Sequence, residues 1–394
     1  MKNNRTFLEK LLDGAEVEWK PLGKVTDIKT GQPVSKNIIA QNPGIYPVIN
    51  SGREPLGFIN EWNTENDPIG ITTRGAGVGS ITWQEGKYFR GNLNYSVTIK
   101  SEYELNVRFL YHVLLYFQKE IHNLCSFTGI PALNASELKK LEIPIPPLPV
   151  QTEIVKILDA LTALTSELTS ELTLRRKQYE HYREKLLSEE ELGKVGFEWK
   201  TLGDVAKIQR GASPRPISQY ITDEPNGIPW IKIGDTSLDS KYIENTAQKI
   251  TVEGAEKSRI LKCGDFVMSN SMSYGRPYIL KISGAIHDGW ASISDFENIL
   301  NSDFLYYYLS SDSVQSYWNG KINSSSVSNL NSDIIKSLPI PIPALHIQIE
   351  IAKTLDKFEI LTNSITEGLP LAIEQSQKRY EYYRELLLNF PVRE

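Results

Sequence analysis

The stretch Leu138–Asp159 reads LKKLEIPIPPLPVQTEIVKILD, and it returns with few changes as Ile335–Asp356, IKSLPIPIPALHIQIEIAKTLD. In each copy a proline-rich strip, 143–149 or 340–343, runs into a segment whose apolar residues recur every three or four positions. Proline cannot sit inside a helix, so each strip is predicted to be an extended, fairly stiff linker that leads into a helix. This pair of stretches therefore predicts a fold that is built twice.

Two further pairs of motifs repeat in the same order. Val17–Gly31 (VEWKPLGKVTDIKTG) matches Phe197–Gly211 (FEWKTLGDVAKIQRG), and Tyr179–Leu187 (YEHYREKLL) matches Tyr380–Leu388 (YEYYRELLL). The chain thus runs as globular unit, helical segment, globular unit, helical segment. Such a duplicated chain presents two similar surfaces, which suits a target that is itself bipartite.

The N-terminus carries a trace of the same repeat. Glu9–Leu12 reads EKLL, as does Glu184–Leu187, and each of them precedes an EWK motif. The chain therefore begins with the tail of the helix that ends the other copy. This pattern predicts a cyclic, pseudo-two-fold arrangement in which the two ends of the molecule meet.

Each helical segment carries a narrow, heptad-like apolar stripe, which is typical of a coiled coil. A helix of about 38 residues is roughly 57 Å long, too long for one small domain, so the two helices are predicted to pack on each other and hold the units apart. The alternative is that each helix folds back on its own globular unit. Gly368-Leu369-Pro370 interrupts the second helix and predicts a bend or break there, with Pro370 starting the next segment. The side chains expected to pack between helices or to meet a partner are Ile154, Leu158, Leu161, Leu168, Tyr179, Tyr182, Leu186, Ile351, Leu355, Phe358, Tyr380, Tyr383 and Leu387.

Each globular unit combines short strand-like runs, punctuated by Gly, Pro, Asn and Asp, with one amphipathic helix. The helices are expected at 107–124 and 303–318. Two mixed α/β (α+β) domains in tandem follow, separated by the long helices. The predicted boundaries are 1–16 for an N-terminal helix tail, 17–146 and 197–343 for the two domains, and 147–196 and 344–394 for the spacer helices.

Composition and charge narrow the class of protein. The chain has 394 residues, a net charge of −5 and two cysteines without a CxxC motif, so a disulfide framework or a cysteine zinc site is not expected. With no signal-peptide pattern at the N-terminus and no apolar run near 18 residues, the sequence predicts a cytoplasmic protein that does not enter a membrane. Residues 17–146 hold 13 basic and 12 acidic residues, and 197–343 hold 14 and 16. Neither domain is basic enough to hold DNA tightly without help.

Catalytic and cofactor motifs are missing. Arg74–Ser80 (RGAGVGS) is not GxGxxG, no GxxxxGK[ST] or GxSxG occurs, and the histidines lack metal-ligand spacing. His112 and His122 are expected to flank a face of the first amphipathic helix. The chain by itself is predicted not to be an enzyme and to bind no cofactor or metal.

The EWK-x-LG opening, the IPIPPLPVQ-x-EI-x-K-x-LD exit, the YE-x-YRE-x-LL tail, and the GIPALN and SVSNLN stretches resemble the specificity subunits of type I restriction-modification systems. The resemblance covers nearly the whole chain. It implies two target recognition domains that each read one half of a split site in double-stranded DNA. The interior loops of the two units differ strongly, which predicts two different half-sites and so an asymmetric target. The resemblance also implies antiparallel spacer helices that set the spacing and dock two methyltransferase subunits. S-adenosylmethionine, ATP and magnesium then belong to methyltransferase and restriction partners, and this subunit is non-catalytic.

Base reading needs polar side chains on loops, with glycine where backbone approaches phosphate. Arg74 and Arg276 are the strongest candidates because each lies in a Gly- or Ser-rich loop after a strand. The rival function is a scaffold in which two modules on a coiled coil bind protein or glycan, a reading that the weak positive charge favours. The candidate DNA contacts are Gln32, Ser35, Lys36, Arg53, Arg74, Lys87, Arg90, Asn92, Asn94, Thr128, Gly129, Arg210, Ser213, Arg215, Lys232, Ser269, Asn270, Tyr274, Arg276, Lys321, Asn323 and Ser325.

Overall fold

The chain divides into two compact units. A computed structural model describes residues 6–52, 54–237, 240–270, 275–323, 330–364 and 366–391. Unit 1 comprises Met1–Glu167 with Ile373–Glu394, and unit 2 comprises Leu168–Ala372. Both divisions fall inside long helices, α7 (Leu148–Leu186) and α15 (Gly368–Leu388).

Unit 1 contains two four-stranded sheets. The first is antiparallel throughout, with strand order β2-β9-β6-β7, and the second has order β4-β3-β8-β5 with β3 and β8 parallel. The strands of the two sheets are β2 (Thr26–Thr30), β9 (Asn94–Ile99), β6 (Ile69–Thr72), β7 (Ile81–Trp83), β4 (Phe58–Ile59), β3 (Pro43–Ile49), β8 (Lys87–Arg90) and β5 (Thr64–Glu65). The remaining elements of the globular part are α1 (Phe7–Leu12), β1 (Glu18–Pro21), α2 (Leu22–Val25), α3 (Lys36–Gln41), α4 (Val107–Tyr116), α5 (Gln118–Asn123), β10 (Cys125–Ser126), β11 (Ala132–Leu133), α6 (Ala135–Leu138) and β12 (Glu142–Ile145).

Unit 2 repeats this plan with larger sheets. Their orders are β14-β23-β20-β21-β17 and β15-β18-β16-β22-β19, and β16 pairs with β22 in parallel as β3 does with β8. The strands are β14 (Lys207–Arg210), β23 (Trp290–Ser294), β20 (Phe266–Ser269), β21 (Pro277–Leu280), β17 (Tyr242–Ile243), β15 (Ile221–Thr222), β18 (Lys249–Ile250), β16 (Ile228–Ile231), β22 (Gly284–Ile286) and β19 (Arg259–Leu261). The other elements are α8 (Glu189–Val195), β13 (Phe197–Thr201), α9 (Leu202–Val205), η1 (Ile217–Gln219), η2 (Ile233–Asp235), α10 (Val252–Glu256), α11 (Ser302–Leu309), α12 (Asp312–Asn323), α13 (Ser332–Lys336) and β24 (Pro339–Pro343).

The proline-rich strips contain strands rather than only the predicted linkers: residues 143–145 and 340–343 lie in β12 and β24, and Leu148 and Pro149 begin α7. β12 pairs antiparallel with β1, which places Trp19 opposite Pro144, and β24 pairs with β13, which places Trp199 opposite Pro341. Prolines are tolerated because each ribbon has only two strands, so alternate backbone N–H groups need no partner. Ile143 and Ile340 of these strands are fully buried, whereas Ile145 and Ile342 are partly buried. The EWK motif and the exit motif therefore repeat together because they form one ribbon.

The long helices agree with the sequence in length and in the position of the break. α7 (Leu148–Leu186) is continuous over 39 residues. The second helical segment is divided into α14 (Leu345–Asn363) and α15 (Gly368–Leu388), with Pro370 in the first turn of α15. A Cβ on Gly368, which has φ +80°, would lie 2.6 Å from the carbonyl oxygen of Ile360. The predicted break near Pro370 is confirmed.

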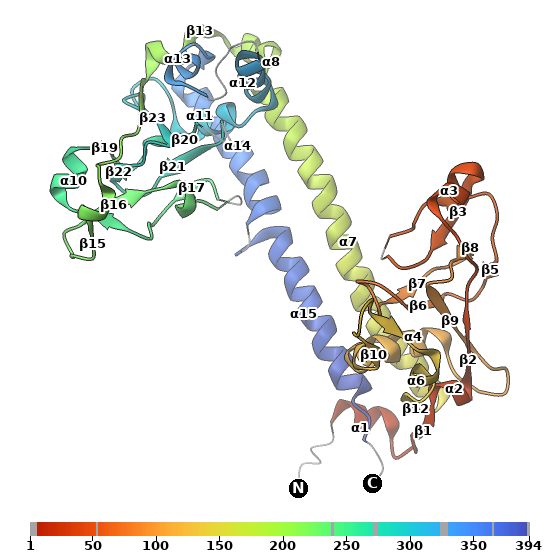
Figure 1. Ribbon diagram of the computed structural model, residues 1–394. Helices are drawn as coiled ribbons and strands as arrows, with labels where there is room; N and C mark the ends of the chain where they lie inside the picture. The colour runs from red at the N-terminus through yellow and green to blue at the C-terminus, as the bar shows by residue number, and fades with distance from the viewer. Residues whose placement is uncertain are drawn as a thin grey trace. The chain divides into compact units, whose positions relative to one another are not determined.

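Within each unit a part of α7 runs antiparallel to another helix (Figure 1). In unit 1 the hydroxyls of Thr165 and Ser376 lie 2.8 Å apart. In unit 2 the guanidinium of Arg176 donates to the carbonyl of Thr362, and Tyr182 stacks on Phe358. The helices also pack on the globular cores, so the predicted coiled coil and its fold-back alternative each describe part of the helices.

The predicted meeting of the chain ends is confirmed in unit 1. Leu8 of α1 shares one core with Leu387, Leu388 and Phe390. In addition, the indole N–H of Trp19 donates to the carbonyl of Pro391 at 3.2 Å. The first and last described segments therefore close the repeat on each other.

The two helices expected inside the globular units are each interrupted. The first is divided into α4 and α5 at Phe117, and the second into α11 and α12 at Ser310 and Ser311. His112 is buried at 1% exposure instead of flanking the helix face. In the described part of the chain, no helix has the length and apolar character that crossing a membrane requires.

Candidate nucleic-acid interface

Several candidate contacts of unit 1 lie on two neighbouring pairs of loops. Arg74, in the loop between β6 and β7, forms a bridge with Ala132, and the N–H of Gly75 donates to Pro131. This places the exposed Arg74 beside the hairpin that carries Thr128 and Gly129 at its tip. Because both loops are exposed and adjoining, they form one surface that can meet a ligand.

The second pair of loops contains Gln32 and Asn92. The backbone N–H of Gln32 donates to Arg90, and Gln32 bridges Gly91. A Cβ on Gly31 would lie 2.2 Å from the carbonyl oxygen of Arg90, so only glycine permits this approach. Gln32 therefore lines a pocket of polar side chains whose other members include Lys29, Asn63, Thr64, Glu65 and Asp67.

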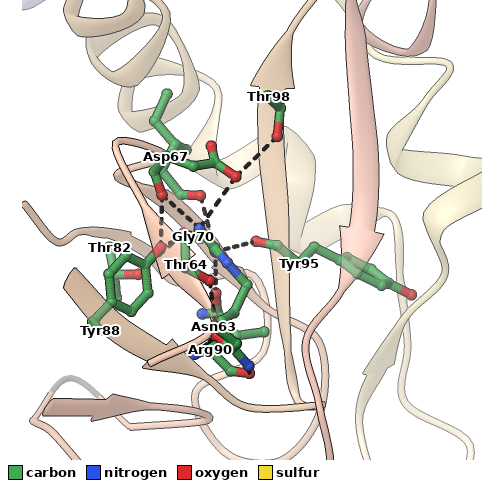
Figure 2. A network of polar contacts seen from close by, with 11 residues as sticks. Asn63, Thr64, Asp67, Gly70, Thr82, Tyr88, Arg90, Tyr95 and Thr98 are labelled. Carbon is green, nitrogen blue, oxygen red and sulfur yellow. Dashed lines mark hydrogen bonds and ion pairs between the residues drawn. The ribbon is translucent and has the colours of Figure 1, made fainter. Parts of the chain in front are cut away.

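The predictions for Arg90 and Asn94 are contradicted because both side chains are buried. Figure 2 shows Arg90 among Asp67, Tyr88 and Tyr95. The Arg90 guanidinium donates to the carbonyls of Ile69, Tyr95 and Asp67 and to the side-chain oxygen of Asn94, at 2.7 to 3.1 Å. It also donates to the hydroxyl of Tyr88, whose pKa burial raises to about 12.

The partners of Arg90 place it between the two sheets of unit 1. Arg90 ends β8 of the second sheet, whereas Ile69 and Tyr95 belong to β6 and β9 of the first. The guanidinium thus joins the sheets inside the unit and is not available to DNA.

The other candidate side chains in unit 1 differ in whether they already contact other groups of the protein. Ser35 accepts a hydrogen bond from the N–H of Ile38 and so caps α3, while Lys36 begins that helix and is exposed. The ammonium of Lys87 lies 4.5 Å from the Trp62 ring and 3.9 Å from Glu65. Arg53 lies outside the described residues.

In unit 2 the candidate contacts converge on Asp288, a residue that the sequence analysis missed. Its carboxylate accepts from Ser213 at 3.0 Å and from Arg215 at 3.4 Å, and its carbonyl accepts from Arg210 and Asn270. Burial alone would raise the pKa of Asp288, but the hydrogen bond from Ser213 and the neighbouring His287 and Arg215 outweigh it and lower the pKa. Asp288 stays ionised and organises this surface. No local motif marks it, because its partners come from two other loops.

A pocket lies beside Asp288 in the position equivalent to the Gln32 pocket. A Cβ on Gly211 would lie 2.0 Å from the carbonyl oxygen of His287, which repeats the close approach at Gly31. The rim of this second pocket is partly apolar. It is lined by Ser213, Pro214, Arg215, Ile217, Ile221, Trp230, Lys232, Gln248, His287 and Asp288. The two units thus place a pocket after the same strand and line it with different side chains.

The remaining candidates of unit 2 are spread more widely. Ser269 is buried at 5% exposure, which contradicts its prediction. Lys232 donates to Gln248 at 2.7 Å, and the Arg276 guanidinium lies 5.3 Å from the Tyr278 ring. Lys321 is exposed. Tyr274, Ser325 and the side chain of Asn323 lie outside the described residues.

The helix residues differ in burial, from fully buried through partly buried to exposed. Leu161, Leu168, Leu186, Phe358, Tyr380 and Tyr383 are partly buried, whereas Ile154, Leu158, Tyr179, Ile351, Leu355 and Leu387 are buried. Tyr182 is 37% exposed and the neighbouring motif residue Tyr382 is 63% exposed. Among the described residues, no group of three or more His, Cys, Asp or Glu side chains is arranged to hold a metal ion.

This duplicated plan has known counterparts. The model of the type I restriction modification DNA specificity domain matches residues 15–174 and 194–375. The chain belongs to this specificity family. A Haemophilus influenzae protein named as a type I restriction enzyme specificity subunit is 41% identical over 99% of this chain and 100% of its own length. The specificity subunit of the type I enzyme EcoR124I/EcoR124II of Escherichia coli is 34% identical over 98% of this chain and 97% of its own.

A solved structure agrees with the fold of the specificity family. The S subunit of a type I restriction-modification system from M. genitalium aligns with a TM-score of 0.59 at 19% identity, covering 97% of this chain and 98% of that one. At this level of identity the likeness bears on the fold, and it extends over both units.

Proposed function

We propose that this chain is the DNA sequence-specificity subunit of a type I restriction-modification complex, with each unit reading one half of a bipartite, asymmetric site. The observation that carries the proposal is the pair of equivalent pockets, after Gly31 and after Gly211, with unlike rims. One is lined mainly by polar side chains, and the other combines Arg215 and Lys232 with apolar side chains. Two similar scaffolds whose pockets carry different side chains are suited to binding two different DNA half-sites.

The subunit acts by recognition and not by catalysis. S-adenosylmethionine, ATP and magnesium would be bound by the methyltransferase and restriction subunits, in the cytoplasm. Two methyltransferase subunits would dock on the spacer helices, where the exposed rings of Tyr182 and Tyr382 offer aromatic anchors. Because the recognition domains are nearly neutral, we expect these partners to supply most of the phosphate contacts.

A methylation map of host DNA, with and without the gene, tests the proposal. Deletion is expected to abolish adenine methylation at one split, asymmetric motif, and replacing residues 197–343 by the matching segment of a relative is expected to change one half of the motif. Unchanged methylation with a working methyltransferase would refute the proposal. The rival scaffold function would be favoured if DNA binding by the assembled complex did not weaken steeply with added salt.

A further inference from the structure

Two aspartates occupy the same position in the repeated exit motif. Asp159 ends the sequence KILD on α7, and Asp356 ends KTLD on α14. Each carboxylate accepts hydrogen bonds from side chains of the recognition domain in its own unit. We call these two clusters the helix clamps.

In unit 1 the clamp is formed by Arg108 and His112 of α4. The Nε atom of Arg108 and the Nε2 atom of His112 each lie 2.8 Å from the same oxygen of Asp159. The Arg108 guanidinium also lies 4.4 Å from the Trp83 ring, at the end of β7. Since β6 and β7 form the hairpin whose loop holds Arg74, this clamp ties that hairpin to the spacer helix.

In unit 2 the clamp contains a lysine from a different element. The ammonium of Lys241 lies 2.7 Å from Asp303 and 3.0 Å from Asp356. The hydroxyl of Tyr307 lies within hydrogen-bond distance of both carboxyl groups, 2.5 Å from Asp356 and 2.7 Å from Glu359. Burial opposes a charge on Lys241, but the surrounding carboxylates outweigh it and raise its pKa.

This lysine also reaches the second recognition hairpin. The carbonyl of Lys241 accepts a hydrogen bond from the N–H of Ile279 on β21, the strand that directly follows Arg276. The spacer helix of unit 2 is therefore tied to a hairpin equivalent to that of unit 1.

The repeat shows that the clamps were built from unlike parts. Asp303 stands where Arg108 stands in the first copy, and Tyr307 stands where His112 stands. The charge on the helix is thus reversed, and Lys241 from the strand edge supplies the cation instead. What the two clamps share is a helix carboxylate, a cation among aromatic rings, and contact with the recognition hairpin.

Stability alone does not account for these charges. Each unit already holds its helix through buried leucines such as Leu158 and Leu355. Asp159 and Asp356 are each 36% exposed, and an ion pair that is partly buried or partly exposed adds little net stability compared with apolar packing. The best-attested use of such a pair is to fix one register among several. A directional ion pair between helix and hairpin can fix the register of one on the other in this way.

We propose that Asp159 and Asp356, through Arg108 and Lys241, are positioning residues that fix each recognition hairpin on its spacer helix and so set the number of unread base pairs between the half-sites. They touch no DNA. The inference rests on the proposed function. One base pair shifts a half-site by about 3.4 Å and turns it around the duplex, so a loosened clamp would accept neighbouring spacings.

The test uses the complete complex with its methyltransferase subunits and a DNA library that holds both half-sites at every spacing near the native one. For Arg108→Met and Lys241→Met we expect methylation at spacings one base pair longer or shorter to rise about tenfold relative to the native spacing, with both half-sites unchanged. Arg108→Lys and Lys241→Arg keep the charge and are expected to restore the selectivity for spacing.

Lys257→Met is the matched control, because Lys257 also pairs with a carboxylate, Glu253, and lies over a ring, that of Tyr220, but at the exposed C-cap of α10. It is expected to change nothing. Loss of methylation in equal proportion at every spacing, together with a lower melting temperature, would show a merely structural role and overturn the inference. If the wild-type complex methylated no split site, the proposed function itself would fail, which is a distinct result.

Discussion

Arg90 is buried, and its guanidinium contacts only groups inside unit 1 among the described residues. Its guanidinium satisfies three backbone carbonyls and the Asn94 amide, so Arg90→Met leaves several buried acceptors unpaired. We expect the free energy of unfolding of unit 1 to fall by about 3–5 kcal/mol. Urea denaturation measures this loss. Arg74→Met is the control, since Arg74 is exposed, and it is expected to leave stability unchanged while weakening methylation at the first half-site. A stable Arg90→Met protein would contradict the role given to the network.

His112 gives unit 1 a dependence on pH. Burial is the larger influence and lowers the pKa of His112 in the folded protein, although the hydrogen bond to Asp159 opposes it. The unfolded chain, with a histidine pKa near 6.5, then binds the proton more readily. Stability is therefore full above about pH 6.5 and is lost as the pH falls through the lowered value.

The effect of His112 can be isolated by substitution. His112→Gln is expected to give a free energy of unfolding that falls less between pH 7 and pH 5 than that of the wild type, as measured by urea denaturation at each pH. His346→Gln changes an exposed histidine and serves as the control. If the free energy of unfolding of the His112 variant fell with pH as steeply as that of the wild type, the prediction would be contradicted.

These two residues also show where sequence reasoning stops. Arg90 looks like a DNA contact because it is an arginine near a glycine, but its partners Ile69 and Tyr95 lie on strands of the other sheet. Asp288 and Lys241 were missed for the same reason, since their partners are distant in sequence. Periodic and repeated features were predicted well, such as the break at Pro370, because they depend on neighbours along the chain.

At the scale of elements, one glutamine in each copy fastens the long helix to its domain. Gln151 accepts from the N–H of Asn106 at 2.8 Å and donates to the carbonyls of Glu104 and Pro146. Gln348 repeats all three bonds with Asn301, Ile299 and Pro343. Both side chains are fully buried. The equivalent ends of α7 and α14 are thus joined to the caps of α4 and α11.

Replacing either glutamine by leucine should have the same effect in its own unit. Gln151→Leu and Gln348→Leu each leave one N–H and two carbonyls without these partners, so each is expected to lower the free energy of unfolding by about 2 kcal/mol or more. Hydrogen exchange of the α4 or α11 N-terminus would locate the loss in the substituted unit. Thr152→Leu, on the exposed side of the same turn, is the control for unit 1. A loss confined to one of the two variants would show that the joints are not equivalent.

At the scale of the whole molecule, the closure of α1 on the end of α15 predicts that the chain tolerates circular permutation. Joining residue 394 to residue 1 and opening the chain at the exposed Gly196 retains the core that Leu8 shares with Leu387 and Phe390. It also leaves the β13–β24 ribbon and α7 intact. Because a cyclic repeat has no privileged starting point, the permuted chain is expected to direct methylation to the same split motif at the same spacing.

A chain opened inside α7, after Leu172, is the control, and it should fail because the opening cuts the continuous helix. If the Gly196 permutant lost the motif while remaining folded, the connection from α8 into β13 would carry a role beyond linking the two copies.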